Sequence, residues 1–364
     1  RRAKEDEEQI PTAAPSGVPL ARGSAFQGVR GQDPAVGILR AALRHGRVAH
    51  AWLFTGPTGV GRELTARRLA AALLCTGRTA DMPADEVCGT CSACARVDRG
   101  LHPDVRVWLS EAEAVRRGLI SWTEERKPSV ELKVEQVREL RDSLRMTAFE
   151  GGWRVAIIPQ AERMRVEAGN ALLKTLEEPL PRSLIILCAP DRRSVMETLR
   201  SRCQRVSFAP LPPEIIAQIL AARRELPPEQ ALVVARQSEG SVARAMAAEP
   251  GSAERSWERA EARLALLTSD PPGELLDLAE QMEKDKDDLE SQVRMLARVA
   301  LHQAEALLQS AGKDGVSARR ARHLALVAGG ALALQAELLR PGVNVRLTLE
   351  RFLLSHRPGV QGLT

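Results

Sequence analysis

Aromatic side chains are scarce in this 364-residue sequence, which contains no tyrosine and only 3% aromatic residues. Alanine, arginine and leucine are abundant instead, and all three favour helices. Long apolar runs are also missing. The most apolar stretch, residues 323–339, is rich in alanine and glycine and contains Gln335, so it predicts a buried helix rather than a membrane span.

A strong charge of one sign is absent as well. The formal net charge is +5, which permits an anionic partner but is better explained by a solvated surface of mixed charge. We find no secretory signal pattern, and four of the six cysteines are clustered. We therefore expect a cytoplasmic protein, without a membrane partner, whose cysteines bind metal or stay reduced.

Five short apolar runs alternate with helical stretches in the first part of the chain. Alternation of this kind predicts an α/β domain, a parallel sheet covered by helices on both faces. The runs are AWLFTG (51–56), DVRVWL (104–109), WRVAIIP (153–159), SLIILCAP (183–190) and CQRVSFAPL (203–211). A helix is predicted over residues 62–74 and another over 133–146, with Val134, Val137, Leu140 and Leu144 on one face.

Composition and periodicity divide the chain into four parts. Residues 1–25 are polar, proline-rich and aperiodic, which predicts a disordered tail. Residues 26–210 hold the α/β pattern. Only helical periodicity follows, and its breaks predict a small helical domain over 211–268 and a helical C-terminal domain over 269–364.

The stretch GPTGVGRE (56–63) nearly matches the phosphate-binding pattern G-x-x-x-x-G-K-[ST]. Its place between a predicted strand and a predicted helix suits a cradle for phosphate. Arg62 replaces the lysine, and Glu63 replaces the hydroxyl that holds Mg²⁺. A carboxylate about 4 Å from a phosphate would be repelled by roughly 4 kcal/mol. The candidate nucleotide-binding residues are Gly56, Thr58, Gly59, Gly61 and Arg62.

A second change lies after the third predicted strand. ATPases with this loop carry acidic residues there, which hold Mg²⁺ and activate water. This sequence has Pro159 and Gln160 instead, and neither can act as a base. A loop that does not hydrolyse ATP is therefore favoured over an active ATPase, and binding of ATP without hydrolysis stays open.

Four cysteines follow the loop helix, within residues 75–94. Cys88, Cys91 and Cys94 have the spacing C-x-x-C-x-x-C, and Cys75 lies further upstream. Such spacing brings four thiolates to one tetrahedral ion and leaves no open position for catalysis. A structural Zn²⁺ is favoured, with a redox pair or an iron–sulfur cluster as the alternatives.

Four segments together resemble the clamp-loader branch of the AAA+ proteins, and among them the delta-prime subunits of bacterial DNA polymerase III. The runs NALLKTLEEP and SRC are highly specific to that branch, and the likeness is strong from residue 26 to 210. The segments are VAHAWLFTGPTGVGRE (48–63), HPDV (102–105), AERMRVEAGNALLKTLEEP (161–179) and LRSRCQRVSF (199–208).

The resemblance implies an AAA+ domain with a five-stranded sheet and an inserted zinc module, then a helical lid and a helical collar. It implies a hetero-pentameric ring with the ATPase (gamma/tau) and delta subunits, which loads a sliding clamp onto primer–template DNA. Arg202 of the SRC motif would act as an arginine finger on a neighbour's ATP. Taken alone, Arg202 would be better explained by a surface ion pair at a helix end, and the motif reverses that preference.

Several other residues have simpler explanations. Cys188 and Arg244 lie where related ATPases carry sensors, but without hydrolysis both are expected to pack or to face solvent. Cys203 is expected to pack, and His50 and His102 are expected in core or turn roles. Two rival functions stay open: an ATP-hydrolysing gamma/tau-like subunit and a zinc-dependent nucleic-acid-binding module.

Overall fold

The computed structural model describes residues 19–123, 126–150, 152–248, 252–269, 272–284, 289–310, 315–338 and 343–357. The chain forms two compact units, residues 1–247 and 248–364, and each is considered by itself. No helix among the described residues is long and apolar enough to cross a membrane.

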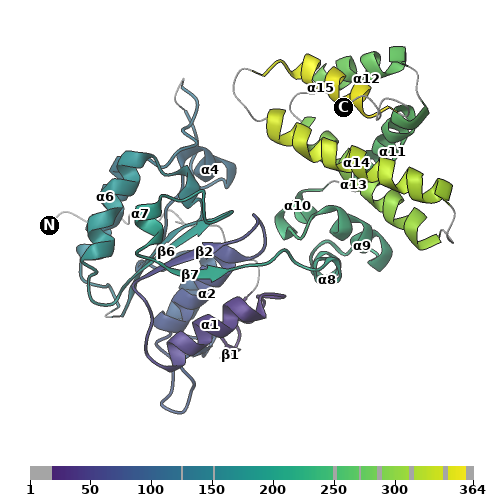
Figure 1. The fold of residues 1–364 in the computed structure, drawn as a ribbon. Helices are drawn as coiled ribbons and strands as arrows, with labels where there is room; N and C mark the ends of the chain where they lie inside the picture. The colour runs from purple at the N-terminus through teal and green to yellow at the C-terminus, as the bar shows by residue number, and fades with distance from the viewer. Residues whose placement is uncertain are drawn as a thin grey trace. The chain divides into compact units, whose positions relative to one another are not determined.

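The first unit is built on the parallel five-stranded sheet that the sequence predicts (Figure 1). The strand order is β4-β5-β6-β2-β7, so the phosphate-loop strand β2 is flanked by β6 and β7. The strands are β2 (Ala51–Thr55), β4 (Val105–Val107), β5 (Arg154–Ile158), β6 (Ser183–Ala189) and β7 (Gln204–Ser207).

Alternate residues of the central strands enter different cores. Trp52 and Phe54 of β2 lie in one core with helices α1 (Asp33–Arg44) and α2 (Arg62–Leu74). Leu53 lies in the other core with α5 (Val134–Arg145) and α6 (Val166–Glu177). Every residue of β2 and β6 is buried, as expected of parallel strands covered on both faces. Figure 1 shows α1 and α2 on one side of the sheet and α6 on the other.

The helices of the first unit begin close to where periodicity predicts them. The predicted helix over 62–74 is α2 (Arg62–Leu74), and that over 133–146 is α5 (Val134–Arg145). The others around the sheet are α1 (Asp33–Arg44), α3 (Ser92–Arg99), α4 (Glu111–Arg116), α6 (Val166–Glu177) and α7 (Glu197–Arg200), with a 3-10 turn at Ala161–Arg163. Three lid helices follow: α8 (Pro213–Arg224), α9 (Pro228–Gln237) and α10 (Val242–Ala247).

The N-terminal tail is shorter than the sequence suggests. Gly23–Ser24 forms strand β1, which pairs antiparallel with β3 (Glu86–Val87) inside the cysteine module. Ala25 is fully buried in the sheet-domain core. Backbone pairing with a segment about 60 residues away gives this stretch an order that its own composition does not predict; residues 1–18 lie outside the described part.

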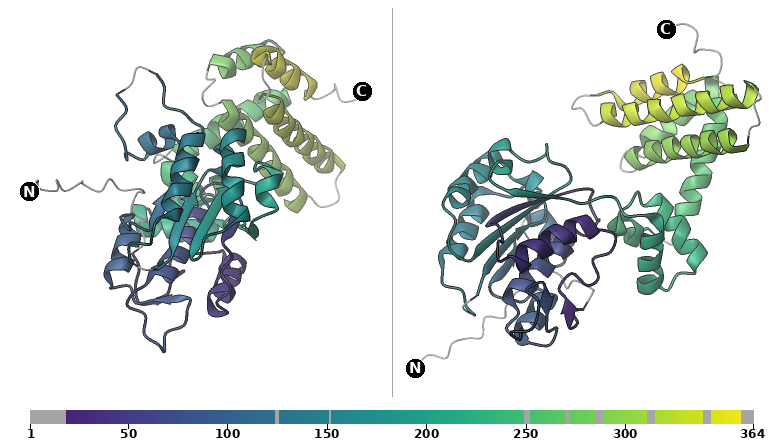
Figure 2. Two further views of the ribbon diagram at one scale, coloured as in Figure 1. Left: turned by 90° about the vertical axis from the view of Figure 1, so that its left-hand side faces the viewer. Right: turned by 60° about the horizontal axis from the view of Figure 1, so that its bottom comes forward.

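The second unit is helical throughout its described part (Figure 2). Its helices share one apolar core, and α13 and α14 lie side by side. They are α11 (Ser252–Ser269), α12 (Pro272–Lys284), α13 (Leu289–Ser310), α14 (Gly315–Leu338) and α15 (Val345–Ser355). We expected α11 in the lid, but its buried Leu264 and Leu267 join this second core.

Candidate functional site

The phosphate-loop segment adopts the turn that its glycines allow. It connects β2 to α2, and Gly59 has a φ of +82°, which favours glycine. A side chain at Gly59 would lie 2.4 Å from Oγ of Ser241, at the start of lid helix α10. The backbone N–H of Val242 donates to the Gly59 carbonyl at 3.0 Å, so the lid packs directly on the loop.

Arg62, in the position of the phosphate-binding lysine, is buried at the first turn of α2. Its side chain lines the pocket beside the loop, and its Nη1 atom is buried without a hydrogen-bond partner. Burial lowers the pKa of Arg62, and the nearby Cys188, Glu162 and Glu63 act weakly in the opposite direction. A buried guanidinium with an unused donor suits an anion at the start of the helix.

Glu63, in the position of the Mg²⁺-binding hydroxyl, is enclosed by arginines. Nη1 and Nη2 of Arg117 donate to its two carboxylate oxygens, each at 2.9 Å, and Nη2 of Arg67 donates to Oε1 at 2.6 Å. Burial acts to raise the pKa of Glu63, but the bonds and charges of Arg117 and Arg67 outweigh it and lower the pKa. Both carboxylate oxygens of Glu63 are therefore engaged by arginines.

Arg117 is itself fixed from a second side. Its Nε donates to Oε1 of Glu113 at 2.7 Å, and only 15% of the Arg117 side chain is exposed. The Ser110 hydroxyl accepts the backbone N–H of Glu113 and caps helix α4. The ion pair between Arg117 and Glu63 thus joins α4 to the loop helix α2. No local sequence pattern indicates this contact, because the partners are 54 residues apart.

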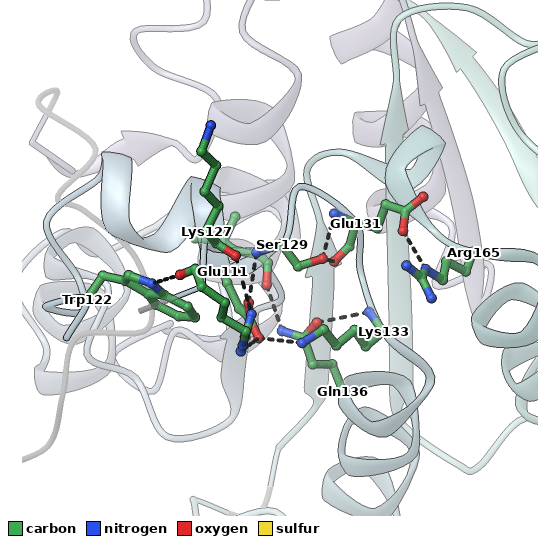
Figure 3. Close-up of polar contacts among 10 residues, drawn as sticks. Glu111, Trp122, Lys127, Ser129, Glu131, Lys133, Gln136 and Arg165 are labelled. Atoms are coloured by element: carbon green, nitrogen blue, oxygen red, sulfur yellow. Dashed lines mark hydrogen bonds and ion pairs between the residues drawn. The ribbon is translucent and has the colours of Figure 1, made fainter. Parts of the chain in front are cut away.

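The first residue of α4 is anchored in turn by the loop that follows the helix (Figure 3). The Glu111 carboxylate accepts from Arg126, from the backbone of Ser129 and from Nζ of Lys133, at 2.8, 2.8 and 2.6 Å. The hydrogen bonds of Arg126 and Lys133 lower the pKa of Glu111. Arg126 also lies over the ring of Trp122 at 4.7 Å, an arrangement that cation–π attraction favours. These contacts fix the helix that presents Arg117.

Two residues after β5 stand where we expect acidic side chains in an ATPase with this loop. Pro159 and Gln160 line the same pocket as Arg62, and neither offers a carboxylate. Glu162 does line the pocket, two residues further on, with a buried Oε2 that lacks a hydrogen-bond partner. Burial raises the pKa of Glu162. We did not assign Glu162 a role from the sequence, because the usual acidic positions lie before it.

These residues surround a pocket of about 610 Å³, large enough for a nucleotide. It is formed within the first unit by the loop, α4, the end of β5 and the lid. Of the predicted nucleotide-binding residues, Thr58, Gly59, Gly61 and Arg62 line it. Gly56 does not; a side chain there would meet the Phe208 carbonyl at 2.3 Å. The pocket has arginines from the loop helix, α4 and the lid, but its carboxylate at Glu63 is already paired.

Arg202 lies outside this pocket, just past α7. Its Nη2 donates to Oε1 of Glu177 at 2.6 Å and its Nη1 donates to the Thr198 carbonyl at 2.9 Å. The side chain is 36% exposed. The ion pair that we considered as the simpler explanation of Arg202 is therefore present, and the guanidinium stays accessible from outside the subunit.

The four clustered cysteines come together. The Sγ atoms of Cys75, Cys88, Cys91 and Cys94 all lie within 4.8 Å of one another, close enough to hold a metal ion. Backbone N–H groups of Cys88, Cys91 and Cys94 donate to the preceding sulfurs at 3.3, 3.3 and 3.4 Å. A side chain at Gly77 would lie 2.7 Å from Sγ of Cys88, so the turn leaves room for the sulfurs. The donor set fits a tetrahedral ion.

Of the remaining candidates, Cys188 lines the pocket at the end of β6, and the others do not. Burial raises the pKa of Cys188 and of Cys203 to about 12, so both are inert thiols that pack. Arg244 pairs with Glu239 within the lid. Ring nitrogens of His50 and His102 contact Leu176 and Glu150, away from the cysteines.

Known proteins are similar to half or more of this chain. The Pseudomonas aeruginosa DNA polymerase III subunit delta' is 38% identical over 183 residues, covering 50% of this chain and 49% of that protein. The Bacillus subtilis subunit delta' is 28% identical, covering 56% and 55%. The Escherichia coli subunit tau is 32% identical over 272 residues, covering 72% and 38%. The chain thus spans about half, or less, of the length of these relatives.

A sequence model of a protein family gives the assignment. The model described as "DNA polymerase III, delta subunit" matches residues 31–212, which is half of the 364-residue chain. The matched region contains the phosphate loop, the four cysteines and Arg202. The chain therefore belongs to the clamp-loader family that this sequence model describes, DNA polymerase III, delta subunit.

Proposed function

We propose that this chain is a delta-prime-like subunit of the DNA polymerase III clamp loader and does not hydrolyse ATP itself. The pairing of Glu63 with Arg67 and Arg117 carries the proposal, since it places a neutralised carboxylate where an ATPase holds Mg²⁺. Pro159 and Gln160 support it, because neither supplies the carboxylate that holds Mg²⁺ or takes a proton from water in an ATPase of this kind. At these positions the pocket therefore offers no free carboxylate to hold Mg²⁺ or to act as the base in phosphoryl transfer.

The catalytic contribution of this subunit is then made through Arg202. Its guanidinium is accessible beyond the helix end, in the SRC motif, and is well separated in sequence from the chain's own loop. An arginine supplied by a neighbour stabilises charge that develops on the γ-phosphate, an effect of about 10³–10⁵ in rate. Arg202 is thus the group that touches the neighbouring ATPase subunit's nucleotide.

The four cysteines bind one structural Zn²⁺ in this account. All four thiolates are used as ligands, so the ion stabilises the module and takes no part in catalysis. Because β3 of the module pairs with β1, the ion also stabilises the position of β1. Loss of the ion would loosen both segments.

The names of the relatives, which are gamma/tau and delta' subunits, support the proposed partners. The chain assembles with the ATPase (gamma/tau) and delta subunits in a hetero-pentameric ring, with its C-terminal helical unit in the collar. Sliding clamp and primer–template DNA are reached through the complex, and any direct DNA contact is made to phosphate and is independent of sequence.

A second candidate is an ATP-hydrolysing gamma/tau-like subunit. The pocket of about 610 Å³, the glycine loop and the unused donor of Arg62 favour nucleotide binding, and the tau and gamma/tau relatives match this chain at 32% identity. Glu162 would then have to replace the missing acidic residues. Binding of nucleotide without hydrolysis is compatible with the first candidate.

Titration of the isolated chain with labelled ATP and Mg²⁺, with phosphate release followed in parallel, separates these functions. Our proposal expects no release above background, with or without binding. Release that disappears in Arg62→Ala would establish the gamma/tau-like function. Salt-dependent DNA binding by the isolated chain, lost in Cys88→Ser, would instead favour a zinc-dependent nucleic-acid-binding module.

A further inference from the structure

The Arg202 guanidinium is held on two sides within its own subunit. Glu177 accepts from Nη2 at 2.6 Å, the Thr198 carbonyl accepts from Nη1 at 2.9 Å, and the Ser201 hydroxyl lies 3.3 Å from Nη1. These three contacts engage at most three of the five N–H groups of the side chain. At least two N–H groups are therefore left to meet a phosphate oxygen while the contact with Glu177 persists.

Helix packing fixes the distance between the two partners. Glu177 is the last residue of α6, and Arg202 follows the end of α7 by two residues. The two helices approach closely at Gly169 of α6, where a side chain would lie 2.4 Å from Sδ of Met196. Because this contact sets the positions of α6 and α7, the ion pair between Glu177 and Arg202 is not needed to join the two helices. It can instead serve to orient the Arg202 side chain.

The exposure of Arg202 and Glu177 also favours an orienting role of their ion pair over a structural one. The two side chains are 36% and 49% exposed, and ion pairs at such positions contribute little to the stability of a fold. A long arginine side chain without partners samples many rotamers, and that freedom is lost when it binds a phosphate. Holding the guanidinium in one orientation beforehand reduces this loss and favours the reactive geometry.

We infer that Glu177 is the positioning residue of Arg202: it orients the guanidinium for the nucleotide of the neighbouring ATPase subunit. The inference rests on the proposed role of Arg202 in trans. Glu177 itself touches no substrate, so its loss changes how often Arg202 is correctly placed and leaves nucleotide affinity as it was.

The test is steady-state ATP hydrolysis by the assembled clamp loader with clamp and primed DNA. Glu177→Ala is expected to lower kcat about 2- to 5-fold, the range of an exposed ion pair, with KM unchanged. Glu177→Gln keeps an oxygen that accepts from Arg202, so most of the activity is retained. Glu178→Ala, which removes the neighbouring exposed carboxylate, is the matched control and leaves kcat unchanged.

A double variant separates positioning from a structural role. In the Arg202→Ala background, Glu177→Ala should cause no further loss, because the group that it orients is gone. An equal loss in both backgrounds, an unchanged kcat or a raised kcat in Glu177→Ala would each overturn the inference. If Arg202→Ala alone left hydrolysis unchanged, the proposed function would fail first, and the inference with it.

Discussion

The ion pairs of Glu63 with Arg67 and Arg117 should stabilise the folded chain, and an unfolding experiment can measure their contribution. Replacing Glu63 with glutamine removes one charge and little volume, and leaves Arg117 facing an amide instead of a carboxylate. Arg117 and Arg67 are 15% and 8% exposed, and Glu63 is 25% exposed. Breaking a fully buried pair costs about 3–5 kcal/mol, and partial exposure of Glu63 and the remaining bond of Arg117 to Glu113 reduce this to about 2–3 kcal/mol.

Urea or thermal unfolding of the purified chain measures this cost. A loss of that size lowers the melting temperature of the first unit by about 5–10 °C. The matched control is Glu178→Gln, an exposed carboxylate at the end of α6, which should change stability by less than about 0.5 kcal/mol. A similarly small loss in Glu63→Gln would refute the reasoning, because the arginines would then be held by something other than Glu63.

The same variant gives a pH dependence with a definite sign. The arginines lower the pKa of Glu63 in the folded state below its unfolded value of about 4.3. The stabilisation is therefore complete above the unfolded pKa and is lost as the pH falls through the folded pKa. The difference in stability between the native chain and Glu63→Gln should shrink below about pH 4.

Three further outcomes are expected. Chelation, or Cys91→Ser, should release one Zn²⁺ per chain, which a zinc-binding dye detects. The amide hydrogens of β1 should then exchange faster with solvent. Retention of the metal in Cys91→Ser would contradict the proposed zinc site. His102 is 2% exposed, and burial lowers its pKa from 6.5 to about 4. The free energy of unfolding should therefore fall by about 3 kcal/mol as the pH falls from 6.5 to 4. His102→Gln should remove this pH dependence. Arg62→Met should leave stability unchanged or raise it, since it removes a buried charge with an unused donor; a large loss would show that Arg62 has a structural partner.

The sequence predicts the sheet and the loop helix well, for local reasons. Strand β2 is a run of apolar residues that ends in glycine, and α2 begins at Arg62 directly after the loop, as predicted. The cysteine cluster was also predictable, since its spacing alone brings the sulfurs together. In these cases the residues that decide the structure are close neighbours along the chain.

Contacts and elements that depend on residues far away along the chain are predicted poorly from the sequence. Arg117 reaches Glu63 from 54 residues away, and no local pattern indicates that contact. Gly23–Ser24 becomes a strand only because β3 offers an edge, and α11 joins the second unit because its leucines meet a core formed by later helices. Glu162 enters the pocket through a 3-10 turn that periodicity does not predict.

The most direct test of the central claim is ATP hydrolysis by the assembled clamp loader with this subunit carrying Arg202→Ala. Our account predicts a fall of about 10³-fold or more in hydrolysis at the neighbouring site, with the isolated subunit inactive in either form. Arg200→Ala, two residues away, should have little effect. Unchanged hydrolysis in the Arg202→Ala complex, or turnover by the isolated chain, would contradict the account.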